Sequence, residues 1–147
     1  MNRRRALRLL ALGPAASACF AGTVGAEEPK LARADWTAIK RVVSQQLAAL
    51  RAGDGDRAFS YASPGIRAQF DDARSFMAMV RAAYAPLLDA RHTEFLEGAV
   101  VDGLIVQPLR LIGRDNRVLV ALYTVEKQKG SWRITGCRLA PSPVQAV

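Results

Sequence analysis

The spacing of apolar residues changes once along this chain, close to Pro86, and this change limits the folds that the chain can adopt. Before Pro86, apolar residues recur every three or four positions, which is the period of an amphipathic α-helix. After Pro86 they alternate with polar residues or form short runs rich in branched side chains, which is typical of β-strands. Helices followed by strands predict an α+β domain with the helices on one face of a sheet.

Three helices are predicted before the change of period, at residues 35–52, 57–62 and 73–84. Asp35 and Asp56 are the predicted N-caps of the first two helices, because a short carboxylate accepts hydrogen bonds from the free N–H groups of a first turn. Residues 66–70 are predicted to form a turn. Pro86 is predicted to end the third helix, since its ring nitrogen cannot donate a hydrogen bond.

Four strands are predicted after the change, at residues 92–101, 104–112, 117–128 and 131–139. Their connections are short, so the strands should be neighbours in a curved antiparallel meander. Pro108 predicts either an edge position or a bulge for the second strand. The third strand is apolar on both faces. One face should pack on the helices, and a homodimer that forms through the sheet would cover the other.

Residues 1–26 have the basic head, apolar middle and small-residue exit of a signal peptide. We expect cleavage to leave one α+β domain at residues 27–147, with a core at 34–140 and an irregular tail at 141–147. The protein is then periplasmic or secreted, and both the general secretory and the twin-arginine route remain open. Residues 16–19 also resemble a lipoprotein cleavage box. Acylation of Cys19 would anchor the protein to a membrane, and no other membrane contact is expected.

The charge of the chain is partly a property of this leader. The formal net charge of +8 falls to +4 without it, because four arginines and no acidic residue lie in residues 1–26. The remaining basic residues are scattered along the sequence, whereas nucleic-acid binding proteins gather them on one face. Specific nucleic-acid binding is therefore not expected.

The chain lacks the residues that most metal and cofactor sites use. It contains a single histidine, and Cys137 is its one cysteine outside the leader, whereas a catalytic metal typically needs three protein ligands. No glycine-rich phosphate loop and no G-x-S-x-G sequence is present. We predict no metal and no cofactor, and we interpret Cys137 as a buried strand thiol.

Two segments of the helical half and one of the sheet carry a family resemblance. Residues 58–70 (AFSYASPGIRAQF), 76–86 (FMAMVRAAYAP) and 123–137 resemble the bacterial domain-of-unknown-function family 4864, DUF4864. The final G-S-W-R-I is more loosely similar to the cone-shaped, cystatin-like superfamily of nuclear transport factor two and ketosteroid isomerase. The resemblance implies a cone-shaped α+β fold and export. It implies no mechanism, because the narrow family has no established activity.

The looser superfamily resemblance implies one catalytic hypothesis, acid–base chemistry by a carboxylate or histidine in an apolar cone. His92 and Glu94 lie two residues apart and should project from the same strand face, and Glu97 follows them. Burial among aromatic rings would tune the pKa of such groups. The alternative is that these charged residues lie at the exposed rim of the sheet. The family resemblance gives none of them a role.

Several aromatic and apolar residues are candidates for lining a ligand pocket between the helices and the sheet. They are Tyr61, Phe76, Met79, Tyr84 and Trp132, with Arg81 as a polar candidate. Such spacing is more often that of an ordinary core. Arg81 is expected to face solvent or an acidic partner, and if it points inward it needs a paired acid or an anionic ligand.

The function that follows is an exported domain that binds a small apolar or anionic ligand, or a protein partner, without catalysis. Two alternatives remain open. One is an isomerase- or dehydratase-like enzyme with an acid or base in an apolar cone. The other is a module that only interacts or dimerises through its sheet.

Overall fold

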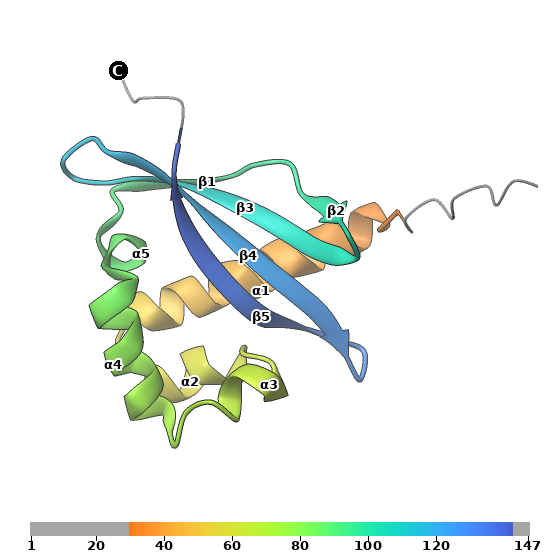
Figure 1. Ribbon diagram of the computed structural model, residues 1–147, viewed down its shortest axis with the longest axis horizontal. Helices are drawn as coiled ribbons and strands as arrows, with labels where there is room; N and C mark the ends of the chain where they lie inside the picture. Colours follow the sequence, from red (N-terminus) through yellow and green to blue (C-terminus); the bar gives the residue numbers. More distant parts are fainter. Residues whose placement is uncertain (1–29, 143–147) are drawn as a thin grey trace, which may run out of the picture.

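The computed structural model describes residues 30–142, and the predicted signal peptide, Cys19 and the last five residues lie outside that range. The described chain is a mixed α+β domain, as the sequence predicts, in which five helices precede a five-stranded antiparallel sheet. The longest helix, α1, runs across one face of the sheet, and the shorter helices gather beside its C-terminal half (Figure 1).

Helix α1 (Arg33–Arg51) buries Ile39, Val43 and Leu47 along one face, as their spacing predicts. The predicted N-cap is wrong, because the helix begins two residues before Asp35 and Ala32 is the N-cap. The Asp35 carboxylate instead reaches back and accepts a hydrogen bond from the Ala32 N–H at 3.3 Å. Gly53 follows the helix with φ +70°, a conformation that glycine adopts readily.

Four shorter helices follow in the described chain: α2 (Gly55–Ser60), α3 (Pro64–Arg67), α4 (Ala73–Ala83) and α5 (Ala85–Asp89). Asp54, rather than the predicted Asp56, caps α2, and its Oδ1 accepts from the Arg57 N–H at 3.1 Å. The expectation of three helices missed α3 and α5, both of which carry a proline in the first turn. A proline is tolerated there because that N–H has no partner within the helix. Pro86 therefore follows α4 and also belongs to the next helix.

The strands are β1 (His92–Phe95), β2 (Ala99–Val101), β3 (Leu104–Ile112), β4 (Val118–Gln128) and β5 (Ser131–Pro141). Their order in the sheet is β1-β3-β4-β5, and β2 also pairs with β3 on the side of β1. Every pairing is antiparallel. The predicted strand at residues 92–101 is therefore two strands, which are separated by residues 96–98.

This break lies opposite Pro108, which settles the two alternatives that the proline left open. Strand β3 has neighbours on both sides, so the edge position is wrong, and the irregularity lies between β1 and β2. The Leu96 N–H donates to the Pro108 carbonyl at 3.1 Å, so this carbonyl faces the side of β1 and β2. The nitrogen of a strand residue faces the same side as its carbonyl, and because the proline nitrogen carries no hydrogen, it cannot donate to a residue there. The Gln107 amide closes the gap by donating to the Leu96 carbonyl at 2.9 Å.

Two groups of buried side chains hold the layers together. The larger group packs Ile39 and Val43 of α1 against Leu109, Leu111 and other residues on the inner face of the sheet. The smaller group joins α1, α2 and α4, and its members include Ala49, Leu50, Ala58, Phe76 and Val80. The space between these two groups becomes the candidate site.

Candidate functional site

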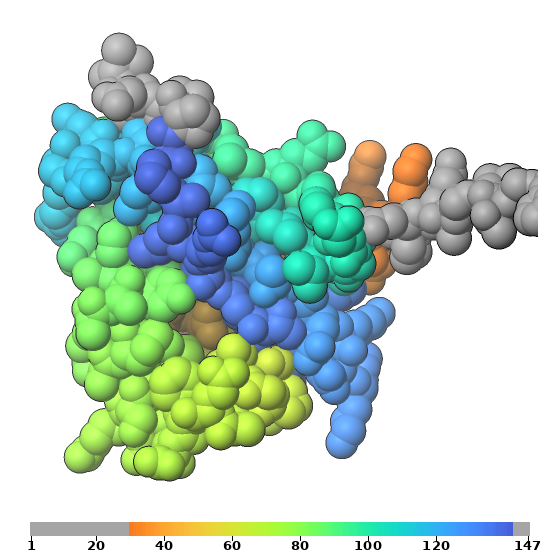
Figure 2. All heavy atoms as spheres, viewed as in Figure 1, coloured from red at the N-terminus to blue at the C-terminus, as the bar shows by residue number. Residues whose placement is uncertain are grey.

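A pocket of about 320 Å³ opens between the sheet and the short helices. It is a hollow bordered by β5, α3 and α4, with α1 in its depth (Figure 2). Its volume lies at the small end of the range of about 300–1,000 Å³ that is usual for ligand sites. None of the described residues that line it is charged.

The pocket walls come from elements that are distant in the sequence. Helix α4 contributes Phe76, Met79 and Val80, which share one face because of their three- and four-residue spacing. Phe70 of the loop after α3 closes the same side and meets Phe76 edge to face, with ring centroids 5.5 Å apart. Strands β4 and β5 contribute Tyr123 and Cys137, which are paired across the two strands and project to the same side.

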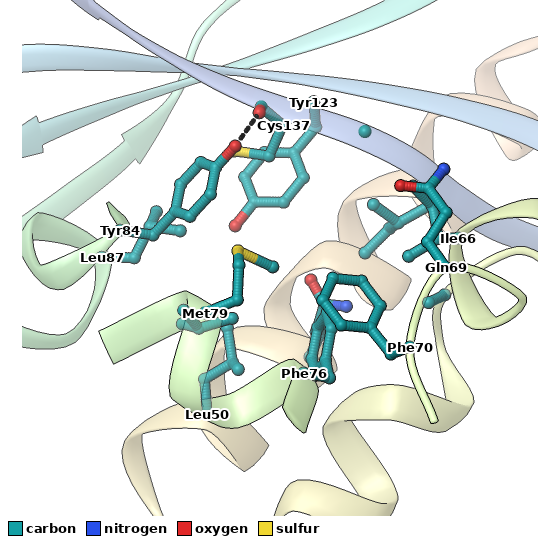
Figure 3. A pocket seen from close by; sticks show the side chains of 15 residues that line it. Leu50, Ile66, Gln69, Phe70, Phe76, Met79, Tyr84, Leu87, Tyr123 and Cys137 are labelled. Atoms are coloured by element: carbon teal, nitrogen blue, oxygen red, sulfur yellow. Dashed lines mark hydrogen bonds between the residues drawn. The ribbon is translucent and has the colours of Figure 1, made fainter. Parts of the chain in front are cut away.

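Tyr123 carries the most unusual polar group of the pocket. Its side chain is 1% exposed and points from the sheet toward Met79, with the hydroxyl directed into the pocket (Figure 3). This hydroxyl has no hydrogen-bond partner among the described residues. Burial raises the pKa of Tyr123 well above 10, so the hydroxyl stays a donor at neutral pH. A buried donor without a partner costs about 1–3 kcal/mol.

The neighbours of Tyr123 do not satisfy this hydroxyl. The Cys137 thiol lies beside it (Figure 3) and is close enough to influence its pKa, but the two groups do not meet the geometry of a hydrogen bond. Cys137 is half-buried, rather than fully buried as the sequence predicts, and desolvation raises the pKa of its thiol to about 12, so at neutral pH the thiol is neither a nucleophile nor an anion. The Tyr84 hydroxyl donates to the Cys137 carbonyl at 2.7 Å and is thereby already engaged. It also ties the end of α4 to the edge of the sheet.

A second polar group lies deep in the pocket on α1. The Gln46 side chain is buried, and its amide nitrogen donates to the Ala58 carbonyl at 3.2 Å. The pocket therefore combines apolar walls with a few neutral polar groups, which are the hydroxyls of Tyr84 and Tyr123 and the side-chain amides of Gln46 and Gln69.

Of the predicted pocket residues, the structure places Phe76, Met79 and Tyr84 in the lining. Trp132 is buried in the larger core group, and the Lys127 ammonium lies 5.6 Å from the centre of its ring. The Tyr61 hydroxyl lies outside the lining and accepts from Arg57 Nε at 3.3 Å. Arg81 is exposed on α4 and points away from the pocket lining.

The predicted acid–base residues are far from this arrangement. His92, Glu94 and Glu97 are exposed, and none of them lines the pocket. Glu94 pairs with Arg110 across β1 and β3. A hydrogen bond from Arg110 and its charge lower the pKa of Glu94, so this carboxylate is ionised and paired at neutral pH. The structure therefore places these residues at the rim of the sheet, the alternative given above.

Three polar residues of the pocket, Gln46, Gln69 and Tyr123, were not predicted from the sequence, although Gln46 and Tyr123 left a signal there. Tyr123 alternates with Ala121 and Val125 on one of the two apolar faces of its strand, and the structure shows that this face is the buried one. Gln46 follows Val43 by three residues and precedes Leu50 by four, which places it on the apolar face of the first helix. A polar residue inside an apolar stripe is the sign that should have selected both.

A second hollow of about 330 Å³ lies between α5 and the turn that joins β3 to β4. Its lining includes Asp89, Arg114, Asp115 and Arg117, which are exposed. No buried polar atom without a partner belongs to its lining in the described chain. The Tyr123 pocket, as we call the first hollow, is therefore the candidate site.

The outer face of the sheet is partly apolar. Val101 and Leu104 are paired across β2 and β3 and are 52% and 59% exposed. Val120 and Leu122 of β4 alternate with the inner residues and are half-buried. Coverage of this face by a second copy of the chain stays a prediction.

The described residues hold neither a cluster of three or more metal-ligating side chains nor a helix both long and apolar enough to cross a membrane. Curated proteins give no match to the sequence. A family described as a domain of unknown function, DUF4864, matches over residues 32–147, which includes nearly all of the described fold. The resemblance found in the sequence is thereby confirmed, and the chain belongs to the DUF4864 family.

Proposed function

We propose that this protein is an exported binding domain that holds a small, mainly apolar molecule in the Tyr123 pocket without transforming it. The observation that carries the proposal is the pocket itself, about 320 Å³ of space lined by apolar side chains, with a buried hydroxyl directed into it. Predominantly apolar walls with a few convergent polar groups are typical of small-molecule sites.

The chemistry of the lining favours binding over acid–base catalysis. An isomerase or dehydratase needs a group that exchanges a proton near neutral pH, within reach of the substrate. The described lining contains no carboxylate and no imidazole. Its titratable groups are Cys137, Tyr84 and Tyr123. Burial raises the pKa of all three, and it is the largest cause of each shift.

The cone shape and the export of the protein are further parts of the proposal. A sheet with α1 across its inner face and a pocket at one end supports the cone-shaped arrangement of the looser superfamily. Export rests on residues 1–26 of the sequence. N-terminal sequencing of the protein recovered from the periplasm tests it, with cleavage after Ala26 as the expected result.

The binding function is tested with indane, a small uncharged bicyclic hydrocarbon, by isothermal titration calorimetry. We expect one indane per chain, and we expect Met79→Trp to abolish binding because the indole fills the pocket. Ala78→Trp is the matched control, because Ala78 is exposed on the same helix and lies outside the lining. Indane binding that survives Met79→Trp would overturn the proposal, as would a failure of the unmodified protein to bind both indane and its ketone, 1-indanone.

A further inference from the structure

We infer that the molecule held in the Tyr123 pocket is neutral and carries a hydroxyl or carbonyl oxygen that accepts a hydrogen bond from Tyr123. This inference rests on the proposed function and names the chemical class of its ligand. It starts from the Tyr123 hydroxyl, which is buried, directed into the pocket and without a partner among the described residues.

No acceptor among the described residues lies in hydrogen-bonding geometry with this hydroxyl. The Cys137 carbonyl is occupied by Tyr84, and the Cys137 thiol is outside hydrogen-bonding geometry. Buried polar groups in folded proteins nearly always have a hydrogen-bond partner. A buried donor without one in the wall of a cavity therefore indicates that a molecule in the cavity accepts its hydrogen bond. An oxygen atom of a ligand that reaches this hydroxyl supplies the missing acceptor.

The charge of the surroundings selects a neutral ligand. No lysine, arginine or histidine lines the described pocket, so a carboxylate or phosphate would lose its hydration without gaining a counter-ion. Arg51 is close enough for its charge to act on Tyr123, but its Nε donates to the Leu87 carbonyl at 3.1 Å. Arg51 also lies outside the lining.

The walls define the rest of the molecule. Phe70, Phe76 and Met79 line the space below Tyr123 (Figure 3), so the part of the ligand opposite the oxygen is apolar. The pocket of about 320 Å³ is roughly ten times the volume that one molecule occupies in liquid water, so it has room for about ten non-hydrogen atoms. A small cyclic or short-chain alcohol or ketone meets these conditions.

Three probes that share one skeleton test this class: indane, its ketone 1-indanone and indane-1-carboxylate. Calorimetry at pH 7 is carried out with the unmodified protein, Tyr123→Phe and Tyr61→Phe. Tyr61→Phe is the matched control, because it removes a hydroxyl outside the pocket lining. We expect Tyr123→Phe to raise the Kd of 1-indanone about tenfold, which is the effect of one lost hydrogen bond. The Kd of indane should stay the same or fall.

The outcomes separate this inference from the proposed function. If indane binds and Tyr123→Phe leaves the Kd of 1-indanone unchanged, the inference fails while the binding function stands. Binding of indane-1-carboxylate as tight as that of 1-indanone also overturns the inference. If neither indane nor 1-indanone binds, the proposed function fails as well. Retained indane binding by Tyr123→Phe shows that this variant is folded.

Discussion

At the scale of single residues, burial determines which groups can act chemically. Cys137 and Tyr123 face each other across β4 and β5 on the inner side of the sheet, and burial raises the pKa of both. His92 and Glu94 have the more reactive side chains, but they are exposed and Glu94 is paired with Arg110. The side chains suited to acid–base chemistry thus lie outside the pocket, and Cys137 and Tyr123, which line it, stay protonated at neutral pH.

We predict that Cys137 is protected from alkylation in the native state. The thiol pKa is raised from 9.0 to about 12, so at pH 8 the reactive thiolate is roughly a thousandfold scarcer than in the unfolded chain. Iodoacetamide labelling followed by mass spectrometry, in a Cys19→Ser background, measures the two rates. Equal rates with and without denaturant would show that the thiol is not buried as described.

At the scale of elements, the interruption between β1 and β2 is fixed by contact with α1. Gly98 lies against the indole of Trp36, and a Cβ on Gly98 would come within 2.2 Å of the ring. The missing side chain therefore lets the sheet approach the N-terminal half of α1. Pro108 removes the ladder hydrogen bond at the same place, so the two features support one break.

We predict that Gly98→Ala destabilises the fold by about 1–3 kcal/mol, the usual cost of overpacking, as measured by urea unfolding. Gly65→Ala is the control, because its Cβ would find only the Ser63 Oγ at 3.8 Å. Stability should be unchanged or slightly higher in that variant. Trp36→Leu should relieve much of the Gly98→Ala penalty in the double variant, since it removes the ring. Additive effects of the two changes would contradict the contact.

Part of this arrangement could be predicted from the sequence, and the rest depended on tertiary contacts. The change of period gave the order of helices and sheet, and the spacing on α4 gave Phe76 and Met79 as residues of one face. The helices that begin at Pro64 and Ala85 were missed, because a proline looks like a stop although it fits a first turn. The break at Gly98 depends on Trp36, which is distant in sequence and invisible to local patterns. The pocket could not be predicted, because its walls come from strands and helices that are distant in the sequence.

At the scale of the whole molecule, three weakly acidic side chains, two phenols and a thiol, lie together where the sheet meets the helices. Tyr84, Tyr123 and Cys137 line one pocket, and burial raises the pKa of each above its ordinary value. Arg51 acts on Tyr123 in the opposite direction, but burial is the larger influence. The native state therefore keeps protons that the unfolded chain releases in alkaline solution.

The free energy of unfolding should in consequence fall as the pH rises above about 9. Between the ordinary thiol pKa of 9.0 and its native value of about 12, the unfolded state has lost the Cys137 proton and the native state has kept it. Stability decreases with pH wherever the native state binds more protons, by up to about 1.4 kcal/mol per pH unit for each such group. The contribution is fully present below pH 9 and is lost as the pH approaches the native pKa.

Cys137→Ala provides the decisive comparison, because it deletes one of the three groups and leaves the tyrosines. Urea unfolding at a series of pH values from 8 to 11 should give a shallower decline for Cys137→Ala than for the unmodified protein. Near pH 11 the two slopes should differ by about 1.4 kcal/mol per pH unit, which corresponds to one proton. The loss of the sulfur shifts the whole Cys137→Ala curve but does not change this difference in slope. Parallel curves would mean that the thiol ionises equally in both states. In that case the interior beside Tyr123 is open to water, and the case for a desolvated, neutral ligand site loses its physical basis.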